Sequence, residues 1–240
     1  MLGGVFGVNP AGGDQGGEAD GLPISDLMAG LMIVFLFIAI ALMRSAFLER
    51  DRIREVAVAY QENQVAIFDA LNEEFSEDLP RWDATIDQGT LSFDFQSPDV
   101  LFEIGRVDIQ PQFQAILEDF FPRYIETIQE FRESIDEIRI EGHTSSDWTG
   151  ATDDSEAYFN NMNLSQGRTR EVLEYAYAIE GVEPERDWIK DRFAAVGFSS
   201  SRLVFNELGE EDPERSRRVS FRVITNAETQ IRRILEDADG

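Results

Sequence analysis

Apolar residues dominate one long stretch near the N-terminus of the chain. Residues 22–46 contain only two charges, Asp26 and Arg44, and residues 27–43 contain none. At 1.5 Å per residue, the first 22 residues of this stretch form a helix of about 33 Å, long enough to cross the hydrocarbon core of a bilayer. The pattern predicts a single transmembrane helix over 22–46. A Gly-rich tail, 1–21, precedes it, and we expect that tail to be disordered.

A secretory signal peptide is the alternative interpretation of the apolar stretch. Such a signal carries a basic segment before its apolar core and small residues at a cleavage site. Residues 1–21 contain Asp14, Glu18 and Asp20 but no Lys or Arg. We therefore expect an uncleaved anchor that crosses the membrane once.

Helical periodicity continues beyond the membrane segment. A stripe of apolar residues, interleaved with charges, follows at helical spacing: Ile53, Val56, Tyr60, Ile67 and Leu71. It predicts a helical linker over 47–88, with a break near Pro80. The stripe could pair with a second copy of itself or pack against the chain's own domain, and the sequence leaves both alternatives open.

Alternating and helical patterns follow one another in the rest of the chain. Alternation of apolar and polar residues predicts strands over 90–95, 135–142, 201–206 and 219–224. Helical periodicity predicts helices over 108–134, 163–179 and 184–196. This order indicates an α+β domain over 89–226, with helices packed on a mixed sheet. A charged helical tail, 227–240, ends the chain.

The charge balance narrows the possible functions. The formal net charge is −26, and Lys190 is the only lysine. Such a field repels nucleic acid, so we expect no nucleic-acid partner. The sequence contains no cysteine, which excludes disulfides and thiolate metal sites.

His143 is the only histidine in the sequence. Because Ser145 and Asp147 lie nearby, a hydrolase is conceivable, but no nucleophile elbow or oxyanion signature accompanies them. We favour a structural histidine at the end of a strand. We therefore expect no enzymatic activity, no metal site and no cofactor.

Asp26 is the candidate functional residue of the membrane segment. A charged carboxylate costs roughly 2.5–3.5 kcal/mol at the bilayer centre, and intramembrane acids usually mark ion or proton pathways. Ala29 and Gly30 lie one turn further on the same face, where small side chains let another helix approach closely. We expect Asp26 to be buried among helices of a partner. The alternative is a helix cap at headgroup level, together with Ser25.

The string Asp26-Leu-Met28-Ala29-Gly-Leu-Met32 resembles the membrane helix of MotB-type stator subunits. The resemblance implies that Asp26 binds and releases the driving ion, H⁺ or Na⁺. It also implies a homodimer whose two membrane helices lie inside a ring of multi-span A-type motor subunits, a pentamer. Burial raises the pKa of a carboxyl group, which suits loading and unloading near neutral pH.

Three further strings resemble the OmpA-like peptidoglycan-binding domain: 138–144, 161–168 and 217–219. The resemblance implies that Arg168, near a helix N-terminus set by Asn163 and Ser165, holds carboxylates of the stem peptide. Asn161 would add a hydrogen bond and Leu164 would belong to the core. The implied peptidoglycan-binding residues are Thr144, Ser145, Asp147, Asn161, Leu164 and Arg168.

The chain departs from the OmpA-like pattern at one position. The family usually has an aspartate where Ser145 stands, and that aspartate contacts the ammonium group of the ligand. Asp147, two residues later, is the candidate substitute. Otherwise, peptidoglycan binding is weak.

An additional helix around 188–196 and the string 197–203 lengthen the usual domain. With these features the chain most resembles Zorya-type B subunits, which implies an ion-driven rotary motor of the bacterial inner membrane in anti-phage defence. A flagellar-type stator subunit and a passive envelope anchor are the alternatives.

The orientation of the chain in the membrane rests on two conflicting indications. The resemblance implies that the C-terminal domain is periplasmic. The positive-inside rule points the other way, because Arg44, Arg50, Arg52 and Arg54 follow the membrane helix. We favour the periplasmic orientation, since large domains can translocate regardless of flanking charge.

Overall fold

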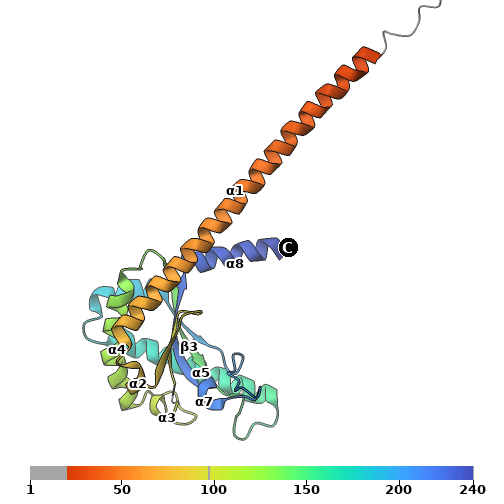
Figure 1. The fold of residues 1–240 in the computed structure, drawn as a ribbon. Helices are drawn as coiled ribbons and strands as arrows, with labels where there is room; N and C mark the ends of the chain where they lie inside the picture. The colour runs from red at the N-terminus through yellow and green to blue at the C-terminus, as the bar shows by residue number, and fades with distance from the viewer. Residues whose placement is uncertain (1–20, 97, 240) are drawn as a thin grey trace, which may run out of the picture. The chain divides into compact units, whose positions relative to one another are not determined.

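The computed structural model describes residues 21–96 and 98–239 (Figure 1). Most of the tail predicted to be disordered, 1–21, lies outside the described residues. Helix α1, Gly21–Phe75, contains 55 residues. The chain divides into two compact units, Met1–Arg52 and Ile53–Gly240.

The first unit contains the apolar part of α1. Its most apolar window has a mean hydropathy of 2.5, and none of that window is buried. Large apolar side chains are exposed along the helix, including Leu27, Met32, Phe37 and Met43. A helix that is apolar and exposed on all sides needs an apolar environment. Within the part of the chain that the structure describes, this is the one helix long and apolar enough to span a membrane.

A five-stranded mixed sheet forms the centre of the second unit, with the strand order β1-β2-β5-β3-β4. All neighbouring strands are antiparallel except β3 and β4, which are parallel. The strands are β1 (Ala84–Asp87), β2 (Ser92–Phe95), β3 (Ile135–His143), β4 (Phe193–Gly197) and β5 (Arg218–Thr225). The predicted fold class, one apolar N-terminal helix followed by helices on a mixed sheet, is confirmed.

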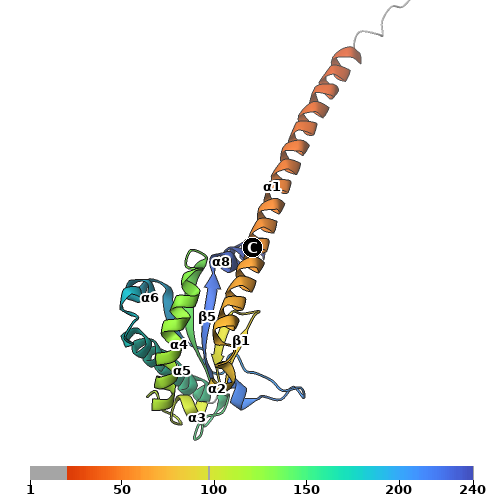
Figure 2. The same ribbon diagram turned by 60° about the vertical axis from the view of Figure 1, so that its left-hand side comes forward.

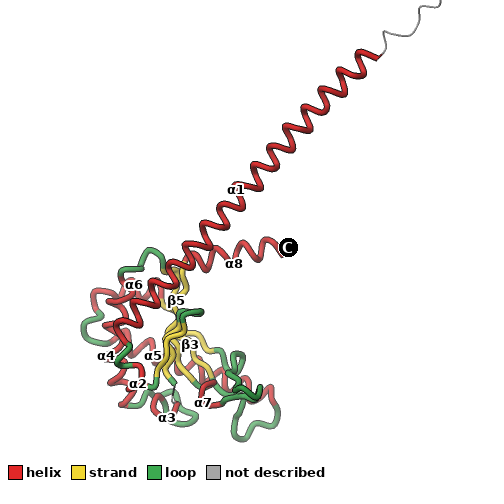
Figure 3. The backbone as a smooth tube through the Cα atoms, in the orientation of Figure 1, coloured by secondary structure: helices red, strands yellow, loops and turns green. Residues whose placement is uncertain are grey.

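Helices α4 and α5 cover one face of the sheet (Figures 2 and 3). The aromatic core lies between them and the strands: the ring centroid of Phe120 is 4.7 Å from that of Phe93 and 5.1 Å from that of Phe221. The longer helices are α4 (Pro111–Gln129), α5 (Asp154–Ala178), α6 (Arg186–Arg192) and α8 (Asn226–Asp239). The short ones are α2 (Leu79–Trp82), α3 (Pro98–Leu101), the 3-10 turn η1 (Glu183–Glu185) and α7 (Pro213–Ser216).

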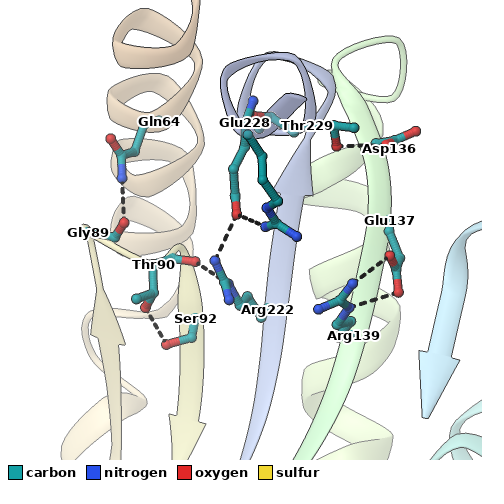
Figure 4. Close-up of polar contacts among 12 residues, drawn as sticks. Gln64, Gly89, Thr90, Ser92, Asp136, Glu137, Arg139, Arg222, Glu228 and Thr229 are labelled. Atoms are coloured by element: carbon teal, nitrogen blue, oxygen red, sulfur yellow. Dashed lines mark hydrogen bonds and ion pairs between the residues drawn. The ribbon is translucent and has the colours of Figure 1, made fainter. Parts of the chain in front are cut away.

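The end of α1 is part of the second unit's core. Ile67, Leu71 and Phe75 are buried, and the ring of Phe75 packs 5.4 Å from that of Phe93. The amide nitrogen of Gln64 donates a hydrogen bond of 2.7 Å to the carbonyl oxygen of Gly89, as Figure 4 shows. The C-terminal part of the predicted stripe, Ile67 and Leu71, therefore packs on its own domain.

The predicted linker 47–88 differs from the structure in its second half. That half supplies core residues from α1 and ends in strand β1, which the sequence analysis missed. A four-residue strand with one buried apolar side chain leaves too short a pattern to recognise.

Three predicted elements beyond the linker are corrected. Helix α5 begins at Asp154 rather than at 163, since Asp153 caps it by accepting a hydrogen bond of 2.8 Å from the backbone N–H of Glu156. The end of the predicted helix 184–196 is strand β4. The predicted strand 201–206 is not part of the sheet; Phe205 only forms an isolated bridge. Short apolar runs are ambiguous between helix and strand.

Candidate functional site

A pocket of about 440 Å³ opens where β3 ends, between the following loop, α5 and the start of β5. All of the residues implied in peptidoglycan binding line it: Thr144, Ser145, Asp147, Asn161, Leu164 and Arg168. These residues are far apart in sequence but close in space, because α5 packs against β3. Gly142 permits this approach, since a Cβ atom there would lie 2.7 Å from the carbonyl oxygen of Ser165.

Arg168 is buried in this pocket without a carboxylate partner. Its Nε donates a hydrogen bond of 2.9 Å to the carbonyl oxygen of Arg106, and its Nη2 donates one of 3.1 Å to that of Glu103. The guanidinium carbon lies 4.6 Å from the ring centroid of Phe102. None of the ion pairs among the described residues involves Arg168. Burial, and then the nearby charge of Arg217, lower the pKa of Arg168 to about 10.

The predicted placement of Arg168 near a helix N-terminus is wrong. Helix α5 begins at Asp154, so Arg168 lies about four turns into it. The potential of a helix end acts over its first turn only, and it does not reach this side chain. The carbonyl oxygens of Glu103 and Arg106 position the guanidinium instead.

Asn161 holds the loop after β3 against α5. Its amide nitrogen donates hydrogen bonds to the carbonyl oxygens of Ser145 (3.1 Å) and Asp147 (3.2 Å). Next to this loop, the buried hydroxyl of Thr144 has no hydrogen-bond partner. The structure thus gives Asn161 an observed positioning role and leaves the Thr144 hydroxyl without a hydrogen-bond partner in the pocket wall.

The remaining wall of the pocket is partly apolar. Leu164, implied as a core residue, is half-buried and lines the pocket, so that expectation is wrong. Ile104, which is 90% exposed, and Trp148 also line the pocket, and Asp147 is exposed at its edge. The pocket therefore combines cationic, anionic and apolar surfaces.

Arg217 is a pocket residue that the sequence analysis did not assign to the site. It is half-buried, and its Nε is buried without a hydrogen-bond partner. Like Arg168, it takes part in no ion pair within the described ranges. The sequence contains a signal for this residue. Arg218 begins β5 and Arg217 directly precedes it, and consecutive side chains in a strand point to opposite faces of the sheet.

The other two candidate residues lie outside this pocket. Asp26 is exposed on α1, and no group in the described part of a single chain pairs with it. His143 is buried, and its ring stacks on that of Phe198 at 5.4 Å. No hydrogen bond joins it to Ser145 or Asp147 among the described residues.

Comparison with known proteins places this pocket within a recognised domain. The model of the OmpA family matches residues 101–218, which include every residue that lines the pocket. The second unit therefore contains a region that is similar to the OmpA family.

The whole chain identifies the family more narrowly. It is 55% identical over 214 residues to Zorya protein ZorB of Escherichia coli, covering 89% of this chain and 91% of that protein. The chain belongs to the ZorB family.

Two solved structures are similar to part of this chain. A MotB-like protein of Desulfovibrio vulgaris has a TM-score of 0.48 and 23% identity, covering 71% of this chain and 94% of that one. The cell wall anchor of the type VI secretion system of Pseudomonas aeruginosa has a TM-score of 0.45 and 19% identity, covering 65% and 97%.

Proposed function

We propose that this chain is a stator B-type subunit of an ion-driven motor in the bacterial inner membrane, anchored to peptidoglycan and active in anti-phage defence. The observation that carries the anchoring is the pair Arg168 and Arg217. Both line one pocket without a carboxylate partner in the described part of a chain whose net charge is −26. Such arginines favour an anionic ligand, because an Arg fork binds a carboxylate with two parallel hydrogen bonds.

The proposed ligand is the diamino acid of the peptidoglycan stem peptide. Arg168 and Arg217 would hold its carboxylate, while Leu164 and Trp148 would contact its aliphatic chain. Asp147 would contact its ammonium group, in place of the aspartate that the OmpA pattern has at Ser145. This assignment puts the domain in the periplasm, where peptidoglycan is, despite the arginines that follow the membrane helix.

The proposed motor depends on Asp26 in the membrane. Two copies of the chain would pair, with their membrane helices inside a ring of multi-span A-type subunits. Each H⁺ or Na⁺ that crosses through Asp26 releases about 2.3 kcal/mol per 100 mV. Because the B dimer is fixed to the wall, this free energy would turn the ring. The chain itself would catalyse no reaction.

Sedimentation with insoluble peptidoglycan tests the anchoring. The full chain in detergent micelles should sediment with purified sacculi, and Arg168→Gln should abolish this at equal protein concentration. Arg170→Gln is the matched control: Arg170 lies on the same helix but is exposed and paired with Glu174 at 3.2 Å. Equal sedimentation of all three proteins would overturn the anchoring proposal.

A further inference from the structure

A second cavity, of about 460 Å³, lies on the face of the sheet opposite α4 and α5. Ser92, Thr90 and Arg222, which Figure 4 shows in front of the strands, belong to its lining. The side chains that matter most here come from β2, β3, β5 and the segment before β5: Asp94, Glu141, His143, Arg215, Arg218 and Ser220.

Several buried polar atoms in this cavity have no hydrogen-bond partner. Glu141 is 3% exposed, and its Oε1 accepts no hydrogen bond, although Nη1 of Arg222 lies 4.0 Å away. His143 is 4% exposed; its Nδ1 has no hydrogen-bond partner, and its Nε2 lies 3.4 Å from Oε2 of Glu141. One carboxylate oxygen of Asp94 is also buried without a hydrogen-bond partner. More than nine in ten buried polar groups are normally hydrogen-bonded. Unpartnered atoms of three side chains around one cavity therefore indicate a polar molecule that binds there.

The register of the sheet places these groups in an ordered pattern. Asp94 and Glu141 are both paired with Ser220, one from each neighbouring strand. The two carboxylates thus flank the same residue, with Cα atoms about 10 Å apart. Arg218 lies two residues along β5 on the same face, about 7 Å from Ser220, and is paired with His143. One end of the cavity therefore carries two carboxylates, of which Glu141 is paired with Arg202 and Arg222 and Asp94 takes part in no ion pair among the described residues. The other end is cationic.

The arginines at the cationic end have N–H groups that lack strong hydrogen-bond acceptors. Nη1 of Arg218 makes only long hydrogen bonds, of 3.3 to 3.5 Å, to backbone carbonyl oxygens. The side chain of Arg215 is exposed. Neither takes part in an ion pair within the residues that the structure covers. Arg202, in contrast, is paired with Glu141 at 2.8 Å.

The protonation states match this polarity. Burial lowers the pKa of His143, against the opposing effect of Glu141, so the imidazole stays neutral. Burial acts to raise the pKa of Glu141, but the interactions with His143 and Arg202 outweigh it and the net shift is downward. Glu141 therefore remains an anion beside a neutral ring that can accept a hydrogen bond.

We propose that this cavity binds a small zwitterion, an amino acid or a peptide end that carries an ammonium and a carboxylate close together. The ammonium group lies on Asp94, beside Ser220, because Arg202 and Arg222 already contact Glu141. The carboxylate lies on Arg218 and Arg215. Ser220 and Arg218 lie about 7 Å apart along β5, which leaves room for the two charged groups with one hydrogen bond at each end. The site is distinct from the pocket of Arg168, which lies on the other face of the sheet.

Equilibrium dialysis of the full chain in detergent micelles, with radiolabelled glycine and D-alanine as probes, tests this site. We expect saturable binding of one probe molecule per chain. Acetate and methylammonium, which each carry half of the zwitterion, should compete at least tenfold more weakly. Absence of saturable binding, or equal competition by acetate or methylammonium, would overturn the proposal.

Two variants locate the bound probe. Asp94→Asn and Arg218→Gln should each weaken binding at least tenfold while the unfolding temperature shows that the domain is folded. Asp94 is chosen because it is only half-buried, whereas a change at Glu141 removes the partner of Arg202. Binding that survives in both variants but is lost in Arg168→Gln would place the zwitterion in the peptidoglycan pocket and refute the second site.

Discussion

Asp26 and Arg168 are charges whose own chain does not neutralise them, and they differ in what surrounds them. Arg168 lies in a pocket that one chain completes, with carbonyl oxygens, an aromatic ring and a second arginine in place. Asp26 is exposed on the apolar part of α1, and no described group pairs with it. On the proposed function, the pocket would bind its ligand as a single chain, whereas the acid would act only once partner helices surround it.

The largest effect is expected at Asp26. In cells that carry the complete defence locus, Asp26→Asn should abolish phage protection, because an amide cannot take up and release an ion at this position. Plaque counts at equal protein level measure it, with co-purification of the A-type subunit as the assembly control. Full protection by the variant would leave a passive envelope anchor, in which Asp26 only caps the helix.

The second largest effect is expected in the pocket that Arg168 and Arg217 line. Arg217→Gln should weaken sedimentation with sacculi at least tenfold, since a hydrogen bond to a charged group contributes about 1.5–3 kcal/mol. Arg168 should remain in place, because its bonds to Glu103 and Arg106 do not involve Arg217. Arg170→Gln again serves as the control, because Arg170 is exposed and paired with Glu174 at 3.2 Å. Unchanged sedimentation of Arg217→Gln would remove Arg217 from the site.

The close approach of α5 to β3 gives a stability prediction. Gly142→Ala should destabilise the domain by about 1–3 kcal/mol, because the new methyl group meets the carbonyl oxygen of Ser165 at 2.7 Å. Thermal unfolding of the full chain measures the change. Gly89→Ala is the matched control, since its nearest contact is a side-chain oxygen of Asp87 at 3.4 Å. Equal unfolding temperatures for the two variants would contradict the steric account.

The smallest effect is expected at the start of α5. Asp153→Ala should cost about 1 kcal/mol of unfolding free energy, because it removes the side chain that accepts from Glu156 N–H. Asp153→Asn should cost much less, since asparagine caps equally well. Denaturant unfolding of both variants measures this difference. A similar loss in both would show that charge, rather than capping, stabilises this end.

The sequence predicted the parts of the fold that carry long, regular patterns. Strands β3 and β5 are nine and eight residues long with alternating apolar residues at their centres, and α4 buries one apolar face, so each was predicted within a few residues. Six residues that line the pocket of Arg168 were predicted through the resemblance to the OmpA-like domain, whereas Arg217 was not. Pattern alone could not have brought them together, because the loop, helix and strand that supply them are far apart in sequence.

The misplaced start of α5 has a local physical reason. Asn163 and Ser165 are residue types that often begin helices, which favoured a start there. The competing signal is the pair Asp153 and Glu156, three residues apart, which forms a capping arrangement. The carboxylate of Glu156 accepts hydrogen bonds from the backbone N–H and hydroxyl of Thr152. That start also makes Arg168 a mid-helix residue.

The buried end of α1 determines where a soluble fragment of this protein can begin. Cutting at 89, the predicted start of the domain, would remove Ile67, Leu71 and Phe75 together with strand β1. The freed surface would include the rings of Phe93 and Phe120, which pack against Phe75 at 5.4 and 5.3 Å. Such a fragment would expose an aromatic patch and an unpaired strand edge, both of which promote aggregation. A fragment intended for crystallisation should therefore keep the helix from before Gln64 onward.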